Sequence, residues 1–339
     1  MKIIISNFSP PVNKTINFKS YWDKHVKPER EERVSLFENR TDWGFHIYSI
    51  GVYLMDKGIA DEVEFWDFSE ERSVSYNSYG ILRVMFYNEE DVIAYLNRYG
   101  CPDLYIQHGG CGGKSILRFF EGKCFRVYVP ALRRGEDLGG NTGAECYLVD
   151  SEEFLDEHSL LYIPVVNTEK IYPNGCENKR DFIYLAAYYP TKRHDILLNA
   201  LRGKDLTGHF HPVDKMMIDL SDTNITATKL NETEVVGLLQ TSKIAVYPGD
   251  LTSNPASMWE CVAAGLPIIV NENIKGGKHL VVPGVTGEFA SEDNFYEVMK
   301  YVLENLNSYR PREYFMENWD TISMIEKYLS FFREMGWRY

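Results

Sequence analysis

One run of the sequence, residues 243–277, constrains the fold more than any other: KIAVYPGDLTSNPASMWECVAAGLPIIVNENIKGG. Its two short apolar stretches, IAVY and LPIIV, have the length and composition of buried strands, and the PGDLTSN between them is typical of a loop. Ser253 or Asn254 can cap a helix that has Pro255 in its first turn and ends at Gly265. The run therefore predicts strand, loop, helix and strand.

A unit of this kind brings the free N–H groups of a helix N-terminus beside the carboxyl ends of strands. Those groups suit a phosphate or a diphosphate. The alternative is an ordinary crossover that binds no ligand, and the spacing alone leaves both interpretations open.

The second half of the run resembles the signature segment of retaining GT-B glycosyltransferases of the E-x7-E type. That segment has a Glu, small residues, a second Glu and then A-x-A-x-G-x-P-V-V. Residues 260–270, ECVAAGLPIIV, match its later part closely. The position eight residues before Glu260 is Thr252, where the family has its first Glu. The resemblance covers most of residues 44–310.

Length and charge set the broad class. The 339 residues have room for two domains, and 36 basic against 49 acidic residues give a net charge of −13. That charge argues against binding to nucleic acid. The six cysteines show no C-x-x-C spacing, and no apolar run is long enough to span a bilayer. We expect a cytoplasmic protein, with peripheral contact to a membrane left open.

Several cofactor motifs are absent from the sequence. No G-x-G-x-x-G follows the apolar stretch near the amino terminus, which argues against a nicotinamide dehydrogenase. The glycine cluster after residue 108 is not a P-loop, because a histidine stands where the first glycine belongs. Asp-x-Asp is absent, and His209 and His211 have no third ligand nearby in sequence. We expect no metal and no cofactor besides the substrate.

A predicted strand in the first half ends at His108, where ligand chemistry concentrates in an α/β sheet. The resemblance implies that His108 lies close to the sugar and the acceptor as a catalytic residue. A histidine in a solvated loop is the alternative. Trp43, Gly44 and Gly109 are expected on the acceptor side. Residues 12–42 look like an insertion, for which acceptor recognition, a lid and a plain surface loop all remain open.

The second domain begins with a predicted strand followed by YYPTKRHD. This resembles the family's G-R-L-x-x-x-K-G-x-D, whose Arg and Lys neutralise the donor diphosphate. Lys192 matches the Lys, Arg193 replaces a Gly, and Ala187 stands at the Arg position. The resemblance implies a catalytic and donor-binding role for Lys192, which Arg193 can support as a phosphate ligand. The alternative is a basic turn that faces solvent.

The resemblance also places a ribose-binding carboxylate at Glu260, although a Glu near a helix N-terminus can serve the helix dipole alone. The full predicted donor-binding set comprises Lys192, Arg193, Thr252, Ser253, Asn254, Ala256, Ser257 and Glu260.

The fold implied is GT-B: two Rossmann-like α/β domains facing a cleft, with the last helix crossing back. We place the acceptor-side domain at 1–168 together with 320–339, and the donor domain at 169–319. The function implied is transfer of a sugar from a UDP or GDP sugar to a glycan, lipid-linked or protein acceptor, as in polysaccharide or glycoconjugate biosynthesis, with retention of configuration and without a metal. The alternatives are a non-catalytic nucleotide-sugar-binding or scaffold subunit, and a relative that isomerises its sugar nucleotide. The base, the sugar, the acceptor and the oligomeric state stay open.

Overall fold

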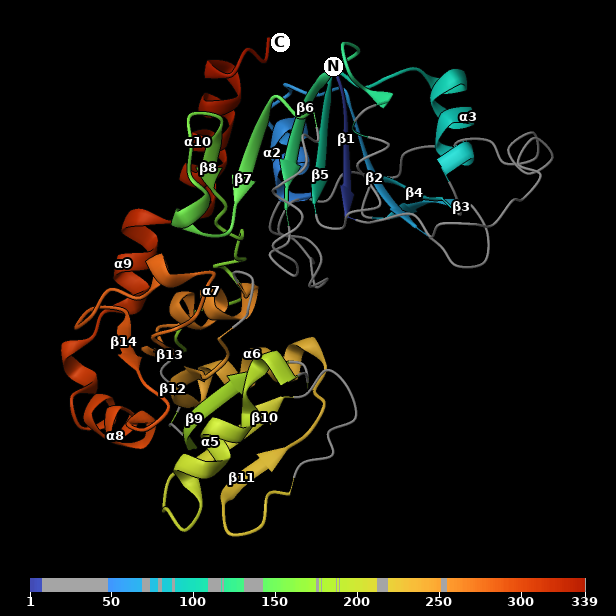
Figure 1. Cartoon of the computed structure of the whole chain (residues 1–339). Helices are drawn as coiled ribbons and strands as arrows, with labels where there is room; N and C mark the ends of the chain where they lie inside the picture. Colours follow the sequence, from blue (N-terminus) through green and yellow to red (C-terminus); the bar gives the residue numbers. More distant parts are fainter. Residues whose placement is uncertain are drawn as a thin grey trace. The chain divides into compact units, whose positions relative to one another are not determined.

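The computed structural model describes residues 1–7, 48–68, 74–78, 81–86, 89–108, 117, 119–130, 143–174, 177, 179–186, 188, 190–211, 219–250 and 255–338. The chain forms two compact units (Figure 1). Unit 1 consists of residues 1–149, 153–165 and 325–339, and unit 2 of residues 150–152 and 166–324. Some predictions fall outside the described residues: the 12–42 insertion, Trp43, Gly44, Gly109, Ala187, Thr252, Ser253 and Asn254.

Unit 1 contains a sheet of eight strands in the order β3-β4-β2-β1-β5-β6-β7-β8. The strands are β1 (Lys2–Asn7), β2 (Glu62–Phe68), β3 (Val74–Ser78), β4 (Ile81–Phe86), β5 (Leu104–His108), β6 (Phe125–Val129), β7 (Cys146–Val149) and β8 (Ser159–Leu161). All neighbours are parallel except β3 and β4, which form an antiparallel pair at the edge. Its helices include α2 (Tyr48–Asp56) and α3 (Glu89–Tyr99).

One face of this sheet carries a buried aromatic cluster around Trp66, which also encloses a charge. Glu64 is fully buried and accepts hydrogen bonds from Trp66 Nε1 and the Tyr95 hydroxyl, both at 2.9 Å, while Lys2 Nζ lies 3.1 Å away. A buried carboxylate is tolerated when partners of this kind satisfy it.

The carboxyl-terminal part of α10 (Thr321–Glu334) also belongs to unit 1 (Figure 1). The Tyr328 hydroxyl donates to the carbonyl of Ile163 at 2.8 Å and accepts from its N–H at 2.6 Å. Phe332 is fully buried, with its ring centroid 6.2 Å from that of Phe125. Residues 325–339 thus pack into the same unit as β1 and contribute to its core.

Unit 2 contains a six-stranded, entirely parallel sheet in the order β11-β10-β9-β12-β13-β14. The strands are β9 (Arg180–Leu185), β10 (Thr207–His211), β11 (Asn224–Ala227), β12 (Ser242–Tyr247), β13 (Ile268–Asn271) and β14 (Gly287–Ala290), and the helices are α5 (His194–Leu201), α6 (Glu232–Gln240), α7 (Ala256–Ala263), α8 (Phe295–Glu304) and α9 (Pro311–Asn318). The chain runs outward from β9 to β11 and then returns to β12 on the other side of β9. The strand order therefore reverses between β9 and β12.

Two segments differ from what their residue pattern predicts. Ser151 followed by two glutamates predicts the start of a helix, but the segment forms only a 3-10 turn, η2 (Glu152–Phe154), none of whose residues is buried. The apolar run at 216–220 predicts a short strand; it lies partly outside the described residues, and positions 219 and 220 are not in a strand. In the described part of the chain, no helix is long and apolar enough to cross a membrane.

Candidate functional site

The carboxyl edge of the unit 2 sheet, between β9 and β12, is the topological switch point of that sheet. In open α/β sheets ligands bind in the crevice at this place, because the loops on either side diverge. Three connections leave the edge near this point: the turn after β9, the segment between β12 and α7, and the segment after β13. The described residues of these connections define the candidate site.

The first turn of α7 is tied directly to the end of β9. Ser257 is 7% exposed, and its hydroxyl donates to the carbonyl of Leu185, the last residue of β9, at 3.0 Å. Pro255, and not Ser253 or Asn254, is the N-cap residue of α7, and no side chain of the described residues caps the helix. The N–H groups of Ala256 and Ser257, which begin the first turn, have no acceptor within the helix, whereas that of Met258 donates to the Pro255 carbonyl at 2.9 Å. The end of β9 therefore lies at the N-terminus of α7, which suits an anion.

Glu260 lies one turn into α7 and is 7% exposed. Carboxylates are rarely buried to this extent. Burial raises the pKa of Cys261 and of Tyr247, and the negative charge of Glu260 adds to both shifts. Glu260 is thus a buried carboxylate of α7, and its role in ribose binding stays a prediction.

Lys192 ends the short 3-10 turn η3 (Pro190–Lys192) that follows β9, and its side chain is partly buried. The hydroxyl of Tyr184, a buried residue of β9, donates to the Lys192 carbonyl at 2.5 Å. Because Tyr184 and Leu185 are adjacent, the same strand end holds both the Lys192 turn and the start of α7. The structure thus brings Lys192, Ser257 and the first turn of α7 to one strand end.

Arg193 adopts the left-handed backbone conformation (φ 48°) at the N-cap of α5. Its guanidinium contacts three carboxylates: Nη1 lies 3.1 Å from Asp250 Oδ2 and 2.7 Å from Glu292 Oε1, and Nε lies 3.2 Å from Asp195 Oδ1. The hydrogen bonds that Arg193 donates to Glu292 and Asp195 raise its pKa above the ordinary value. A direct role of Arg193 in diphosphate binding stays a prediction.

Asp250 and Glu292 have no place in the predicted set. They lie 57 and 99 residues from Arg193, so no local pattern links them to it. For Asp250, the sequence offers only its place in the predicted loop 248–254.

His108 is the last residue of β5 in unit 1 and is partly buried. Its ring centroid lies 5.8 Å from that of Tyr162. The prediction of a histidine at a strand end is therefore confirmed as a position, while its role in catalysis stays a prediction.

The two histidines of the HFH stretch lie at the end of β10. His209 Nδ1 is 2.9 Å from the Thr226 hydroxyl, and His211 Nδ1 accepts from the N–H of Leu230 at 3.1 Å. Burial lowers the pKa of both histidines, which favours the neutral form. Among the described residues, no group of three or more potential ligands is arranged to hold a metal.

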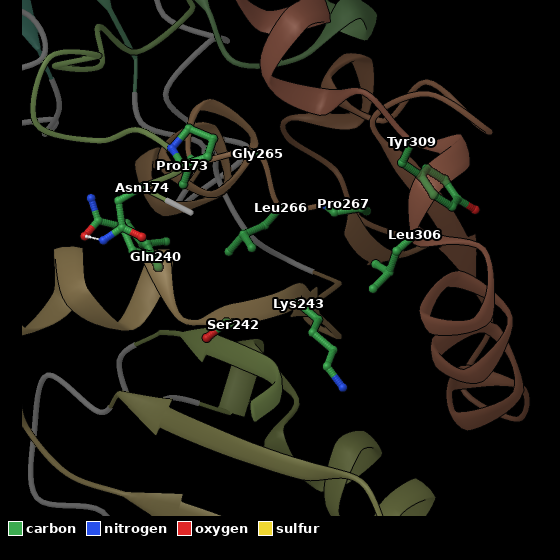
Figure 2. A pocket seen from close by; sticks show the side chains of 12 residues that line it. Pro173, Asn174, Gln240, Ser242, Lys243, Gly265, Leu266, Pro267, Leu306 and Tyr309 are labelled. Atoms are coloured by element: carbon green, nitrogen blue, oxygen red, sulfur yellow. Dashed lines mark hydrogen bonds between the residues drawn. The ribbon is translucent and has the colours of Figure 1, made fainter. Parts of the chain in front are cut away.

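A cavity of about 270 Å³ opens at the other edge of unit 2 (Figure 2). It is lined by Ser242, which begins β12, and by Pro267, which precedes β13, so it lies at the amino ends of these strands. On one side, Asn174 Nδ2 donates to Gln240 Oε1 at 2.7 Å (Figure 2). The cavity thus lies at the opposite edge of the sheet from the candidate site.

Comparisons with known proteins concern the fold. No protein-family model matches the sequence, and no curated protein matches it significantly. Among solved structures, sucrose-phosphate synthase from Thermosynechococcus elongatus is similar with a TM-score of 0.71 and 12% identity, covering 99% of both chains. Anabaena HepE, solved in complex with UDP and glucose, has a TM-score of 0.67 and 11% identity over 97% of this chain and 98% of that chain.

The lipopolysaccharide outer core galactosyltransferase WaaB, in its apo form, has a TM-score of 0.66 and 13% identity over 98% of this chain and 99% of that chain. These likenesses extend over nearly the whole chain in each case. Identities this low establish architecture rather than activity. Together with the two doubly wound units described above, they show that the chain has the GT-B fold.

Proposed function

We propose that the protein is a glycosyltransferase that moves a sugar from a nucleoside diphosphate sugar to a glycan, lipid-linked or protein acceptor. The observation that carries the proposal is the hydrogen bond between Ser257 and the end of β9. It ties the start of α7, the helix that carries the buried Glu260, to the end of β9, where Tyr184 also binds the Lys192 turn. The GT-B fold supports the same conclusion, as does the neighbour solved with UDP and glucose.

Each part of this edge matches a part of the donor. The N–H groups of Ala256 and Ser257 and the ammonium of Lys192 would offset the charge that develops on the departing diphosphate. The carboxylate of Glu260 would accept hydrogen bonds from two ribose hydroxyls. Because protein groups supply this positive charge, we propose a reaction that needs no metal.

We assign the acceptor side of the reaction to unit 1, from the position of His108 in its sheet. His108 ends a central strand of its sheet, and we propose that it acts beside the transferred sugar. Thr252, Ser253 and Asn254 would contact that sugar. Retention of anomeric configuration is part of the proposal on the strength of the sequence resemblance.

A thermal-shift panel of UDP, GDP, ADP, CMP and dTDP, each with and without common sugars, tests donor binding. A ligand that binds only the folded protein raises the unfolding midpoint by mass action. We expect a clear shift with one nucleotide, followed by release of that nucleotide when its sugar conjugate meets an acceptor. The absence of any shift would contradict the proposal. Binding of a sugar nucleotide without hydrolysis or transfer would instead favour a non-catalytic subunit.

A further inference from the structure

We propose that Arg193 is a positioning residue that, through Asp250, anchors the start of the connection between β12 and α7 (residues 248–255). This inference rests on the proposed function, because that connection leads into the predicted donor-binding residues. It assigns Arg193 a role different from the phosphate contact expected from the sequence.

The guanidinium joins three connections at the carboxyl edge of unit 2. Nη1 and Nη2 bind the two oxygens of Glu292, which follows β14, at 2.7 and 3.0 Å. Nη1 also reaches Asp250, which follows β12, at 3.1 Å, and Nε reaches Asp195 in the first turn of α5. A planar guanidinium with several fixed donors can bridge separate carboxylates in this way.

The segment that begins at Pro248 is held from the opposite side by β13 and the residues after it. Asn271 Nδ2 donates to the Pro248 carbonyl at 2.8 Å, and the Lys275 N–H donates to the Asp250 carbonyl at 3.1 Å. Arg193 provides the contact from the side of β9 and α5. Asp250 is thus fixed through its backbone by one neighbour and through its carboxylate by another.

Two features argue against Arg193 as the main phosphate ligand. Three carboxylates already bind the donors of this one guanidinium, so a diphosphate would have to displace contacts within the protein. The left-handed backbone at φ 48° is also unfavourable for a residue with a Cβ, and glycine would adopt it without cost. The contacts of the side chain offset that cost, and they are contacts to the protein.

The test begins with hydrogen exchange in the ligand-free, full-length protein. Arg193→Gly removes the guanidinium while relaxing the backbone, so loss of the anchor is separated from strain. We expect amide exchange in a peptide covering 249–258 to rise about tenfold. The affinity for UDP, used as the probe, should fall roughly 5- to 30-fold.

Two further variants sharpen the test. Asp250→Asn should reproduce both changes. The double variant should be no worse than Arg193→Gly, because Arg193→Gly already removes the contact to Asp250. Asp195→Asn is the matched control: it removes a carboxylate from the same guanidinium but leaves the Asp250 contact intact. Exchange and UDP affinity of that variant should match the wild type.

Three outcomes would overturn the inference. One is unchanged exchange in Arg193→Gly. Another is weaker UDP binding in Arg193→Gly with full binding in Asp250→Asn, which would make Arg193 a direct phosphate ligand. A third is a lower unfolding midpoint with unchanged UDP affinity, which would leave Arg193 a purely structural role. Hydrogen exchange is measured without nucleotide and therefore tests the Arg193–Asp250 anchor by itself. A wild-type protein that fails to bind UDP would contradict the proposed function but would leave this test of the anchor valid.

Discussion

At the scale of single residues, Glu260 is the most informative position. Glu260→Gln keeps the side-chain volume but removes the charge, so the two proposed hydrogen bonds from ribose weaken. We expect the affinity for the bound nucleoside diphosphate to fall roughly 10- to 100-fold, as measured by calorimetry. Pyrophosphate lacks a ribose and should bind wild type and variant alike. A folded Glu260→Gln protein with wild-type nucleotide affinity would remove the ribose assignment.

His108 is expected to affect turnover rather than binding. If it acts on the transferred sugar, His108→Ala lowers kcat roughly 100-fold and leaves the KM for the donor nearly unchanged. The neighbouring Tyr162, whose ring packs against His108, gives a control. Tyr162→Phe keeps the ring and should keep the rate. A variant of His108 with full kcat would place this histidine outside the reaction.

His194 makes the stability of unit 2 depend on pH. Burial lowers the pKa of His194 to about 4, while the unfolded chain keeps its ordinary value of 6.5. The unfolded state therefore binds the proton first, so stability is full above pH 6.5 and falls as the pH drops toward 4. The loss at pH 5 is about 2 kcal/mol.

The variant His194→Phe suits the surrounding rings of Tyr184 and Phe210, whose centroids lie 4.8 and 5.6 Å from that of His194. Urea unfolding at pH 5 and pH 7.5 should show a smaller difference in the variant than in the wild type. An equal difference would assign the acid sensitivity to other groups.

At the scale of elements, the pairing of β13 and β14 depends on Gly287. A Cβ at this position would lie 1.8 Å from the Ile268 carbonyl oxygen, so Gly287→Ala must push the strands apart. We expect a loss of about 3 kcal/mol or more in the free energy of unfolding.

Gly237 is the matched control for this substitution. It lies within α6, and a Cβ there meets no atom within 4 Å. Gly237→Ala should stabilise the protein by roughly 0.5–1 kcal/mol, because alanine loses less backbone freedom in a helix. Chemical denaturation of both variants measures the contrast, and equal effects would contradict the packing described here.

Elements with a strong hydrophobic pattern are the ones that the sequence predicts. The apolar runs at β1, β9, β12 and β13 are recognised. The LNETEVVGLL of residues 230–239 likewise predicts the helix α6, whose capping box joins Asn231 and Glu234. The hairpin of β3 and β4 and the helix α9 are not predicted. The VSYNS of β3 has little apolar character, and α9 buries only Pro311 and Phe315.

The same contrast holds for the candidate site. Lys192 and Glu260 belong to local motifs and can be named from the sequence. The cluster around Arg193 joins residues from three connections, and only the sheet order brings these connections together. The bond from Ser257 to Leu185 spans 72 residues and is equally invisible in the sequence.

At the scale of the whole molecule, unit 1 depends on the last helix. Phe332→Ala removes a fully buried ring from unit 1 and should cost about 3–5 kcal/mol. Hydrogen exchange is expected to accelerate in peptides of unit 1, whereas peptides of unit 2 serve as an internal reference. Ile322→Ala, on the same helix but 42% exposed, should change stability by about 0.5 kcal/mol or less. An equal acceleration of hydrogen exchange in both units would contradict the assignment of this part of α10 to unit 1.

The way the chain is divided also sets an order of events during synthesis. Nearly all of unit 2 is one continuous stretch, 166–324, whereas unit 1 also needs residues 325–339. Domains usually fold as units while the ribosome is still extending the chain, the amino-terminal one first. Here the order of completion is reversed: the unit that contains β1 is finished only after residues 325–339, which follow all of unit 2, have left the ribosome. Until then the surfaces that later receive Tyr328 and Phe332 stay uncovered, and the growing chain is most open to misassembly at the unit it made first.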